Sequence, residues 1–386
     1  MALLFIAMAS AMRPPARMIT RVSPARRCFS RGVASLLAQD NDPAMPASLQ
    51  SDGVDVLPVA SKLCIIDGHA LAYRMHFALQ STKMSTVQRE PTHIVHGFLK
   101  KMLDLHTRFP SHRMLVAFDL PGPTFRMAEL PTYKEGRPAM PSPLRAQLPL
   151  VQEACALLAC PTLSAEGFEA DDVIASCVRE ATAMGASDVV IVAVDKDLMQ
   201  LVATDEAAAT RVTMWNDKAR QSVDAAAVEA KHGVAPAQMG DLLALMGDSS
   251  DSVPGVPGIG AKTAAKLLHE YAPPASRPLF MIIRGPAPLT RGRYGDLEGV
   301  LSAASSGAMK PSKRRTALVE SIEIARRARR LVELASDAPV DVSLLRSGSL
   351  RFDHPGLGAF LTRWELNTIG RTIDEQIRLR DLRPQV

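Results

Sequence analysis

GDSSDSVPGVPGIGAKTAAKLL, from Gly247 to Leu268, is the stretch around which the rest of the chain can be interpreted. Its first half places Asp248 and Asp251 in a turn rich in glycine and serine. Its second half has closely spaced glycines and prolines up to Gly260, followed by an apolar pattern of helical period. A glycine-rich turn that leads into a helix presents unpaired backbone N–H groups and the positive end of the helix dipole. The stretch therefore predicts a cation site beside a phosphate-binding turn, although the glycine pattern alone fits a purely structural loop equally well.

The composition predicts a soluble globular protein. The chain has 386 residues, enough for one large domain or two smaller ones, and 47% of them are hydrophobic. No apolar run approaches the ~18 residues of a membrane span, so we expect no membrane contact. The five cysteines show no CxxC spacing, which predicts reduced thiols on apolar faces rather than a zinc site or a disulfide framework.

The first forty residues differ in composition from the rest. Residues 1–39 contain six arginines, no lysine and no acid, and without those arginines the net charge of +5 becomes about −1. An arginine-rich, acid-free start is typical of an organellar transit peptide. We therefore expect residues 1–40 to direct import into a mitochondrion or a plastid, and residues 41–60 to form a linker. A secretory signal is the alternative, but its positive charges would precede the apolar run.

Three short apolar runs each lead into an aspartate: Lys62–Ile66 into Asp67, Arg113–Phe118 into Asp119, and Asp188–Val194 into Asp195. Runs of this length between helical patterns indicate buried strands of a mostly parallel sheet, with Arg211–Trp215 as a further strand. Helical periodicity is predicted for His93–His106, Leu144–Leu158, Glu169–Met184, Asp224–His232 and Pro236–Met246. Ligands bind beyond the carboxyl ends of such strands, so the pattern predicts an α/β fold, a mostly parallel central sheet flanked by helices, with a site at that edge.

Nine acidic residues are expected near that edge: Asp67, Asp119, Glu169, Asp171, Asp172, Asp195, Asp197, Asp248 and Asp251. Two carboxylates ~5 Å apart repel by roughly 3 kcal/mol at an effective dielectric of ~20, so a converging set requires counter-cations. Oxygen ligands without His or Cys favour Mg²⁺, with Mn²⁺ able to substitute. Two such ions together can activate a water and stabilise the leaving oxygen in phosphodiester hydrolysis. One or two of the acids at 169–172 are also explained by the dipole of the helix that begins there.

A second group of residues is predicted to bind a nucleic-acid backbone. It comprises Gly255, Gly258, Gly260 and Lys262 of the turn, with Lys310, Lys313, Arg314 and Arg315 of a basic run that extends to Arg330. Such a run is often only the solvated face of a helix, but after a phosphate-binding turn it favours a surface that follows the backbone. Residues 272–312 are expected to be loop with one short helix. Residues 337–386 have weak strand and helix patterns and are expected to pack on the catalytic domain.

Five segments resemble, in order, the motifs of the 5′→3′ exonuclease domain of bacterial DNA polymerase I, a member of the flap endonuclease superfamily. They are IIDGHALAYR, AFDLPGPTFR, GFEADD, VDKDLMQLV and GDSSDSVPG. The resemblance covers roughly residues 60–270 and, more weakly, continues to about residue 370. It implies a PIN-like fold with a helical helix–three-turn–helix DNA-binding subdomain, and a metal-ligand role for the nine acids. It also suggests K⁺ at the Gly255–Gly260 turn.

Residues 124–143 are similar to the family's helical arch, through which a free 5′ end is threaded. Within it, Tyr133, Lys134 and Arg137 match the family's YKxxRP pattern. The resemblance implies a catalytic group in which Lys134 and Arg74 neutralise the scissile phosphate, Arg137 adds a further cation, and Tyr133 stacks on a base. Without that match, a surface loop with solvated cations would be the simpler interpretation.

Three positions depart from the family's pattern: His69 replaces Ser, Val194 replaces Gly and Ser252 replaces Asn. None of these changes removes a carboxylate, but Val194 adds bulk beside Asp195. The predicted domains are the catalytic domain at 61–230, the helix–three-turn–helix region at 231–335 and a C-terminal segment at 336–386.

The combined prediction is a monomeric, organellar 5′→3′ exonuclease and 5′-flap endonuclease that hydrolyses DNA by a two-metal mechanism. Its expected partners are DNA with 5′ ends or flaps, RNA primers and organellar replication proteins. Two alternatives remain open: a nuclease of the same fold that acts mainly on RNA or RNA–DNA hybrids, and a catalytically weak flap-DNA-binding protein.

Overall fold

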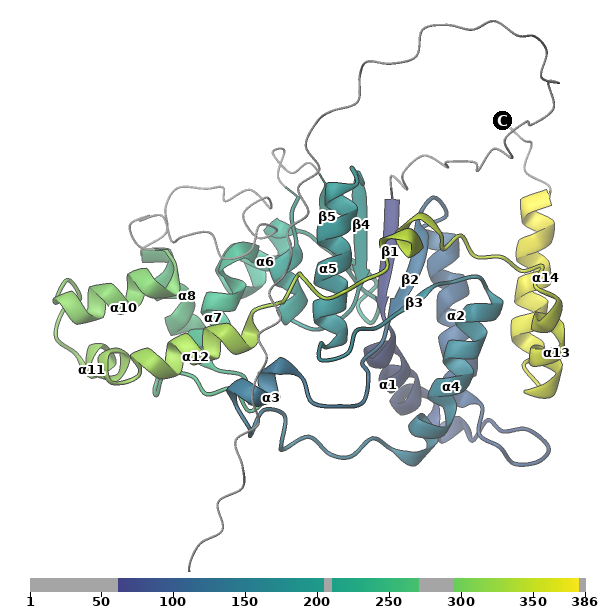
Figure 1. The fold of residues 1–386 in the computed structure, drawn as a ribbon, viewed down its shortest axis with the longest axis horizontal. Helices are drawn as coiled ribbons and strands as arrows, with labels where there is room; N and C mark the ends of the chain where they lie inside the picture. Colours follow the sequence, from purple (N-terminus) through teal and green to yellow (C-terminus); the bar gives the residue numbers. More distant parts are fainter. Residues whose placement is uncertain (1–61, 205–209, 271–294, 382–386) are drawn as a thin grey trace, which may run out of the picture. The chain divides into compact units, whose positions relative to one another are not determined.

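A six-stranded sheet of order β3-β2-β1-β4-β5-β6 lies at the centre of the computed structural model (Figure 1), which describes residues 62–204, 210–270 and 295–381. The strands are β1 Lys62–Asp67, β2 Arg113–Ala117, β3 Thr162–Leu163, β4 Asp188–Val192, β5 Arg211–Asn216 and β6 Gln221–Val223. All neighbours pair in parallel except β5 and β6, so the predicted mostly parallel sheet is confirmed. β3 and β6 were not predicted because two and three residues are too few to show a strand pattern.

Thirteen helices are described. They are α1 Gly68–Leu79, α2 His93–Arg108, α3 Phe125–Glu129, α4 Ser142–Leu157, α5 Ala170–Ala183, α6 Ala225–His232, α7 Met239–Met246, α8 Ala261–Glu270, α10 Leu297–Ser306, α11 Lys313–Glu320, α12 Ile322–Val332, α13 Pro355–Arg363 and α14 Asn367–Asp381. Short 3₁₀ turns occupy Gln80–Thr82, Asp197–Leu201, Pro236–Gln238 and Val342–Arg346. The helix predicted over Pro236–Met246 is therefore a 3₁₀ turn followed by α7, since the chain changes hydrogen-bond pattern at Gln238.

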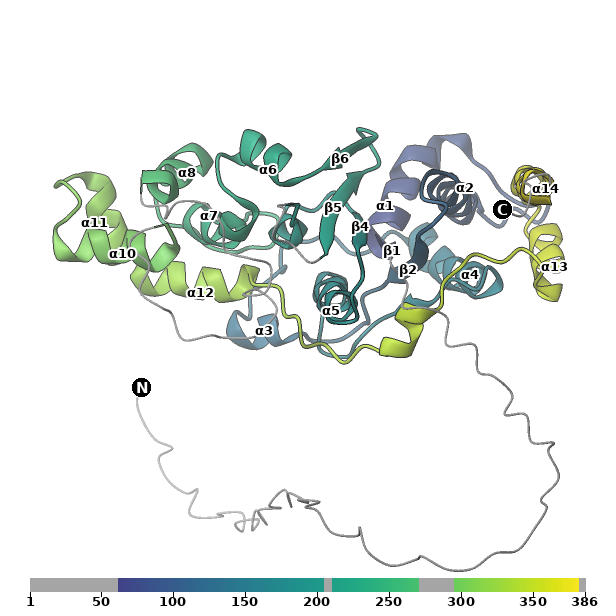
Figure 2. The same cartoon turned by 90° about the horizontal axis from the view of Figure 1, so that it is seen from above.

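The sheet separates two hydrophobic cores because successive residues of a strand face opposite sides. Leu63 and Ile65 of β1 pack with α5 and with the helices of residues 225–332. Cys64 and Ile66 pack with α1, α2 and α4 on the other side. Figure 2 shows α5 and α1 on opposite sides of the strands. Because β1 pairs in parallel with both β2 and β4, the carboxyl ends of the three strands lie at one edge of the sheet.

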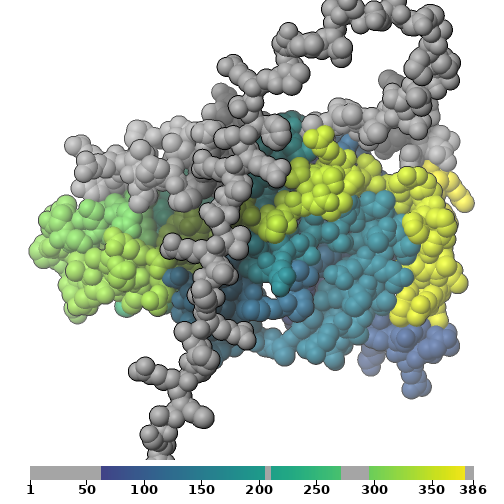
Figure 3. Space-filling view, in the orientation of Figure 1, coloured from purple at the N-terminus to yellow at the C-terminus, as the bar shows by residue number. Residues whose placement is uncertain are grey.

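The C-terminal helices cover the second core. α13 packs on α4 and α14 on α2, and Phe360 and Trp364 are buried in the same cluster as these helices. In Figure 3 the yellow surface of α13 and α14 lies against the blue surface of α2 and α4. Residues 336–354 are irregular apart from one 3₁₀ turn, and α13 and α14 follow, so the weak strand patterns predicted in this segment are wrong. The apolar residues of the two helices repeat at helical spacing on one packed face.

Several predictions from the sequence concern residues outside the described ranges, including the transit peptide at 1–40 and the linker at 41–60. Within the ranges, the segment predicted as loop with one short helix contains α10. The four described cysteines, Cys64, Cys155, Cys160 and Cys177, are free and buried, as predicted. No described helix has both the length and the apolar character needed to cross a bilayer.

Candidate active site

The three strand-end aspartates meet at the carboxyl edge of the sheet. Asp67 caps α1, where its Oδ1 accepts a hydrogen bond from Ala70 N at 2.9 Å. Asp119 follows β2, and its Oδ1 accepts from Ala170 N at 2.7 Å, which ties it to the start of α5. Asp195 follows β4 and accepts from Asp197 N at 3.0 Å. A backbone N–H therefore orients each carboxylate. For Asp67 and Asp195 the N–H lies two or three residues further along the chain, and for Asp119 it lies at the start of α5.

A cavity of about 630 Å³ opens at this edge. Its acidic wall consists of Asp67, Asp119, Glu169, Asp171, Asp195 and Asp251. Its apolar wall consists of Tyr73, Leu120, Pro121, Met140 and Leu148. Three side chains that can carry positive charge also line the cavity: Lys134, Arg137 and His69. Six of the nine predicted acids therefore share one cavity, although they come from five separate parts of the sequence.

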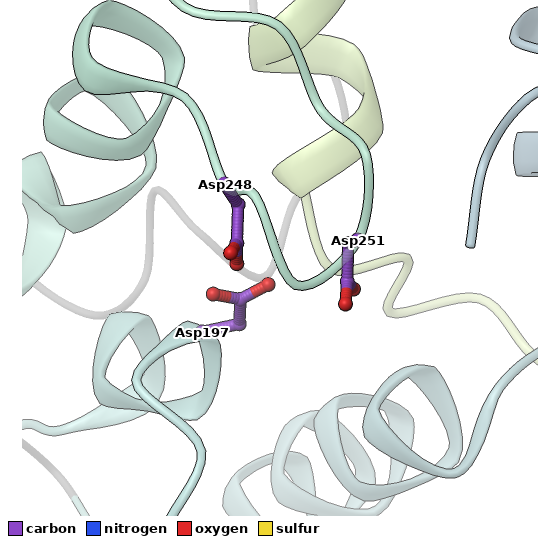
Figure 4. Close-up of side chains that lie close together, drawn as sticks. All are labelled: Asp197, Asp248 and Asp251. Carbon is purple, nitrogen blue, oxygen red and sulfur yellow. The ribbon is translucent and has the colours of Figure 1, made fainter. Parts of the chain in front are cut away.

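A second acidic group adjoins the cavity. Carboxylate oxygens of Asp197, Asp248 and Asp251 all lie within 4.8 Å of one another (Figure 4). Asp197 comes from the turn after β4, whereas Asp248 and Asp251 come from the turn after α7. Because Asp251 also lines the cavity, it connects the two groups. The stretch GDSSDSVPG is therefore part of the same acidic centre as the strand-end aspartates.

The acids in the centre raise one another's pKa. Burial raises the pKa of Asp67 to about 7, with the charges of Asp119 and Asp195 adding to the effect. Burial and the charge of Asp195 raise the pKa of Asp197 to about 8. Burial and the same charge raise the pKa of Asp171 well above its usual range. Such repulsion between buried carboxylates is relieved by bound cations, and their oxygen donors fit hard divalent ions.

Asp248 behaves differently from these acids. Burial would raise its pKa, but hydrogen bonds from the Ser250 hydroxyl and backbone and the ammonium of Lys196, 3.0 Å away, hold the pKa below its usual range. His69 contacts a different acid: its Nδ1 accepts a hydrogen bond from Asp119 N at 3.1 Å, and burial lowers the pKa of His69. The acidic centre therefore offers carboxylate oxygens as ligands, and Lys196 partly neutralises one of these carboxylates, Asp248.

Glu169 is held by three residues of the segment before it. Its Oε1 lies 2.6 Å from Lys134 Nζ, and its Oε2 accepts from Tyr133 Oη at 3.0 Å and lies 3.2 Å from Arg126 Nη1. Tyr133 also donates to Asp251 Oδ2 at 3.2 Å and is only 5% exposed. The predicted stacking of Tyr133 on a base is therefore wrong for this conformation, because the ring is packed in the core and its hydroxyl orients two acids.

Asp172 does not join the acidic centre. It is 0% exposed, and its two oxygens form a bidentate pair with Arg126 at 2.6 and 2.7 Å. The same oxygens accept from Glu169 N and Ala335 N. We therefore withdraw Asp172 from the predicted metal ligands, since every lone-pair direction is already used. Sequence analysis missed Arg126, although it lies inside the quoted segment AFDLPGPTFR.

Arg126 also connects the centre to α12. Its Nε donates to Leu331 O at 2.7 Å, and its Nη2 donates to Glu333 O at 2.7 Å. Gln200 makes a parallel connection, because its Nε2 donates to Asp197 O and to Val332 O. The C-terminal end of α12 is thus bonded to Arg126 of α3, which pairs with Asp172 of α5, and to the turn that carries Asp197.

The two cations of the predicted arch, Lys134 and Arg137, contact the turn that carries Asp248 and Asp251. Lys134 N donates to Asp251 O at 3.0 Å, and Arg137 pairs with the carboxylate of Asp251. Lys134 and Ser252 both have positive φ, 59° and 58°. A backbone hydrogen bond and an ion pair therefore hold the segment around Lys134 against the turn. Arg74 lies outside this group and pairs with Asp217 at 3.0 Å, although its charge acts on Asp67.

We expect Ser252→Asn to stabilise the protein by about 0.5–1 kcal/mol, because Asn adopts positive φ more readily than Ser. Chemical denaturation of both proteins measures the difference. Ser302→Asn, in α10 and exposed, is the control and should not stabilise. A Ser252→Asn protein that is less stable than wild type would contradict the role of the φ angle.

The glycines of the turn have separate functions. A Cβ on Gly255 would lie 2.4 Å from Met246 C, so this glycine is required by packing inside the protein and not by a ligand. A Cβ on Gly258 or Gly260 would meet no atom within 4 Å, and both residues are exposed. Gly260 immediately precedes α8, and Lys262 is exposed in its first turn. Of the predicted phosphate-binding residues, Gly258, Gly260 and Lys262 thus face solvent.

The basic run likewise contains residues that are bonded inside the protein and residues that face solvent. Arg326, Arg329 and Arg330 pair with Glu298, Asp241 and Glu129, and Arg315 Nε donates to Ala304 O at 2.7 Å. Arg315 therefore helps to pack α11 on α10, which corrects its assignment to the binding surface alone. Lys310, Lys313 and Arg314 are exposed, and no ion pair involves them within the described ranges. These three side chains are available to a polyanion.

Two family models match consecutive parts of the chain. The model described as 5′-3′ exonuclease, N-terminal resolvase-like domain, matches residues 62–233, and the 5′-3′ exonuclease, C-terminal SAM fold, matches residues 234–273. DNA polymerase I of Rhizobium leguminosarum is 36% identical over 321 residues, which is 81% of this chain and 28% of the polymerase. DNA polymerase I of Deinococcus radiodurans is 38% identical over 291 residues, 75% of this chain and 27% of the polymerase. The chain thus spans little more than a quarter of these relatives.

Solved structures support the same fold. A structure of bacteriophage T5 5′-exonuclease with bound divalent zinc ions superposes with a TM-score of 0.55 at 20% identity, over 81% of this chain and 98% of the other. A bacteriophage T5 flap endonuclease in a pseudo-enzyme–product complex with DNA and metal ions gives a TM-score of 0.53 at 22% identity, over 81% and 99%. At this level of identity the likeness establishes the fold alone.

Proposed function

We propose that this chain, which belongs to the 5′-3′ exonuclease family, is a nuclease that hydrolyses DNA from 5′ ends and at 5′ flaps, using two Mg²⁺ ions. The observation that carries this proposal is the convergence of eight predicted acids on one cavity and its adjoining cluster, at the carboxyl edge of the sheet. A merely DNA-binding protein would gain nothing from placing mutually repelling carboxylates there.

The candidate ligands divide into two groups that share Asp251. One is the acidic wall of the cavity, and the other is Asp197, Asp248 and Asp251. Bound divalent ions would supply Lewis-acid stabilisation of phosphate oxygens and a more acidic water. Mn²⁺ offers the same coordination chemistry and is expected to substitute.

The chain's own residues position the substrate around that chemistry. Lys134 places its ammonium at the acidic wall, so it can neutralise charge that develops on a phosphate in the cavity. Tyr133 and Arg126 hold Glu169 in one orientation. The apolar wall can accept a nucleoside without recognising its sequence, because it offers contact area rather than hydrogen-bond partners.

The exposed turn at Gly258–Gly260 is proposed to bind the duplex backbone away from the cleavage site. Lys262, Lys310, Lys313 and Arg314 would add phosphate contacts. The family resemblance is the only support for K⁺ at this turn. The composition of residues 1–39 supports an organellar location, where RNA primers and replication proteins would be further partners.

The function is tested with a 5′-flap duplex incubated with Mg²⁺, with Mn²⁺ and with chelator. We expect cleavage with either metal and none with chelator. The same duplex with an RNA 5′ strand distinguishes the principal alternative, since a preference for RNA would overturn the proposed DNA substrate. Tight binding without cleavage under any metal would identify a DNA-binding protein instead.

We expect Gly260→Val and Lys262→Ala to weaken duplex binding regardless of sequence. The valine would hold the backbone away from a phosphate, although the structure itself has space for it. Loss of one phosphate contact should reduce the salt dependence of binding by about one unit for Lys262→Ala. Affinity measured at several salt concentrations tests this. Lys266→Ala is the control, because Lys266 is 69% exposed on the same helix and pairs with Glu270.

We expect deletion of residues 1–40 to abolish import into organelles and to preserve nuclease activity, because the composition is that of a removable targeting segment. Import is measured with a reporter fused to residues 1–40 and with the truncated chain. Import of the truncated chain, or its loss of cleavage in vitro, would contradict this prediction.

A further inference from the structure

Two arginines near the acidic centre use their donors in opposite ways. Every guanidinium nitrogen of Arg126 is bonded, and the residue is 2% exposed. Arg74 makes one hydrogen bond, from Nη1 to Asp217 Oδ2 at 3.0 Å. Its Nε is buried, and the described ranges provide that atom with no acceptor. A buried guanidinium donor without a partner is costly, so this arrangement favours an acceptor that arrives with a ligand.

Asp217 is held from two sides. Lys101 Nζ lies 3.1 Å from Oδ1, while Arg74 occupies Oδ2. The side chain of Asp217 is 10% exposed and those of Lys101 and Arg74 are each 19% exposed. The three residues come from the β5–β6 turn, α2 and α1, and Asn216 stabilises the turn by accepting from Ala219 N at 3.0 Å. The carboxylate therefore connects three elements with little access of water to screen the pairs.

Lys101 leaves the charge of Arg74 available. Asp217 carries one negative charge but faces two cations. Because Lys101 offsets part of that negative charge, the positive charge of Arg74 is not fully neutralised. Asp104 also contacts Lys101, at 3.6 Å, but its side chain is 48% exposed and largely screened by solvent. Arg74 lies one turn after Ala70, which lines the cavity, on the same face of α1, and its charge lowers the pKa of Asp67 in the acidic wall.

We propose that Asp217 is a positioning residue, which fixes Arg74 so that its remaining donors face a phosphate of the substrate. Lys101 compensates the charge of Asp217 and thereby preserves the attraction of Arg74 for that phosphate. The inference rests on the proposed function and on the expectation, from the family resemblance, that Arg74 neutralises the phosphate being cut. Neither Asp217 nor Lys101 lies in a segment that the sequence analysis assigned to the site.

The test is a mutant cycle on a 5′-flap duplex with Mg²⁺. We expect Asp217→Asn to lower the single-turnover rate by about tenfold to a hundredfold, because the guanidinium of Arg74 would no longer be held in its productive position. Duplex affinity in Ca²⁺ should stay within about twofold, because most phosphate contacts lie elsewhere. In an Arg74→Ala background the same change should lower the rate no further. Asp217→Glu, which keeps the charge, should recover part of the rate.

Glu180→Gln is the matched control, because it removes one carboxylate paired with an arginine at the far end of α5. It should leave rate and affinity unchanged. An Asp217→Asn protein as fast as wild type, or one that slows Arg74→Ala equally, would overturn the inference. Equal losses of rate and affinity would also overturn it, since they indicate a binding or folding defect. A wild-type protein without metal-dependent cleavage would show instead that the proposed function itself fails.

Discussion

Asp171→Asn should lower the cleavage rate on a 5′-flap duplex by more than about a hundredfold. Residues that only support a metal ligand typically cost 10–100-fold, and Asp171 is a candidate ligand itself. Its carboxylate lies among Asp67, Asp195 and Asp197, so no neighbour can take over its position without moving. Asp119→Asn, at the carboxyl end of β2, should have the same effect. Single-turnover rates with saturating Mg²⁺ measure both.

The controls separate chemistry from folding and binding. Flap-duplex affinity in Ca²⁺ should stay within about threefold of wild type, because phosphate contacts elsewhere dominate it. Without metal, Asp171→Asn should be at least as stable as wild type, because the change removes repulsion among buried acids. Asp353→Asn, a control on an exposed ion pair, should leave the rate unchanged. Near-normal turnover of Asp171→Asn would exclude it from the metal site.

Arg126→Met should destabilise the protein by about 3–5 kcal/mol, because it leaves the buried carboxylate of Asp172 without its cation. The same change removes the donors to Leu331 O and Glu333 O, so the end of α12 should also lose its hydrogen bonds to α3. Denaturant unfolding, monitored without substrate, measures the loss independently of activity.

Arg326→Met provides the comparison. Arg326 pairs bidentately with Glu298, but their side chains are 42% and 39% exposed. Solvent screens such pairs, so this variant should lose less than about 1 kcal/mol. If the two variants lost similar stability, burial would not be the reason for the strength of the Arg126–Asp172 pair.

The positions of Asp67, Asp119 and Asp195 were predictable because each follows a short apolar run. In a parallel sheet such runs end at the same edge, so the order of residues along each strand already brings the three acids together. The α/β alternation and the breaks at glycine and proline likewise predicted the bounds of α2, α4, α5 and α6 to within a few residues. The turn of Asp248 and Asp251 was predicted as a cation site from its own residues, and the motif resemblance supported its place in the acidic centre, for which strand geometry offers no argument.

The predictions for Asp172 and Tyr133 needed the tertiary structure. Asp171 and Asp172 are adjacent in sequence, but the helical rotation between them turns one toward the cavity and the other toward Arg126. Sequence spacing does not reveal which of two such neighbours faces a site, because the direction depends on how the helix packs. Similarly, the hydroxyl of Tyr133 finds Glu169 and Asp251 only once the arch segment lies on the turn.

The sequence by itself therefore determined the fold class, the sheet edge that carries the acids and the family to which their motifs belong. These properties depend on periodicity and on residue order, which are local. The tertiary structure alone decided which acids share a cavity, which arginines are bonded inside the protein, and that Asp217 holds Arg74 across 143 positions of sequence. Those outcomes depend on contacts between distant segments, whose geometry is set by the packing of both cores and not by any one stretch of chain.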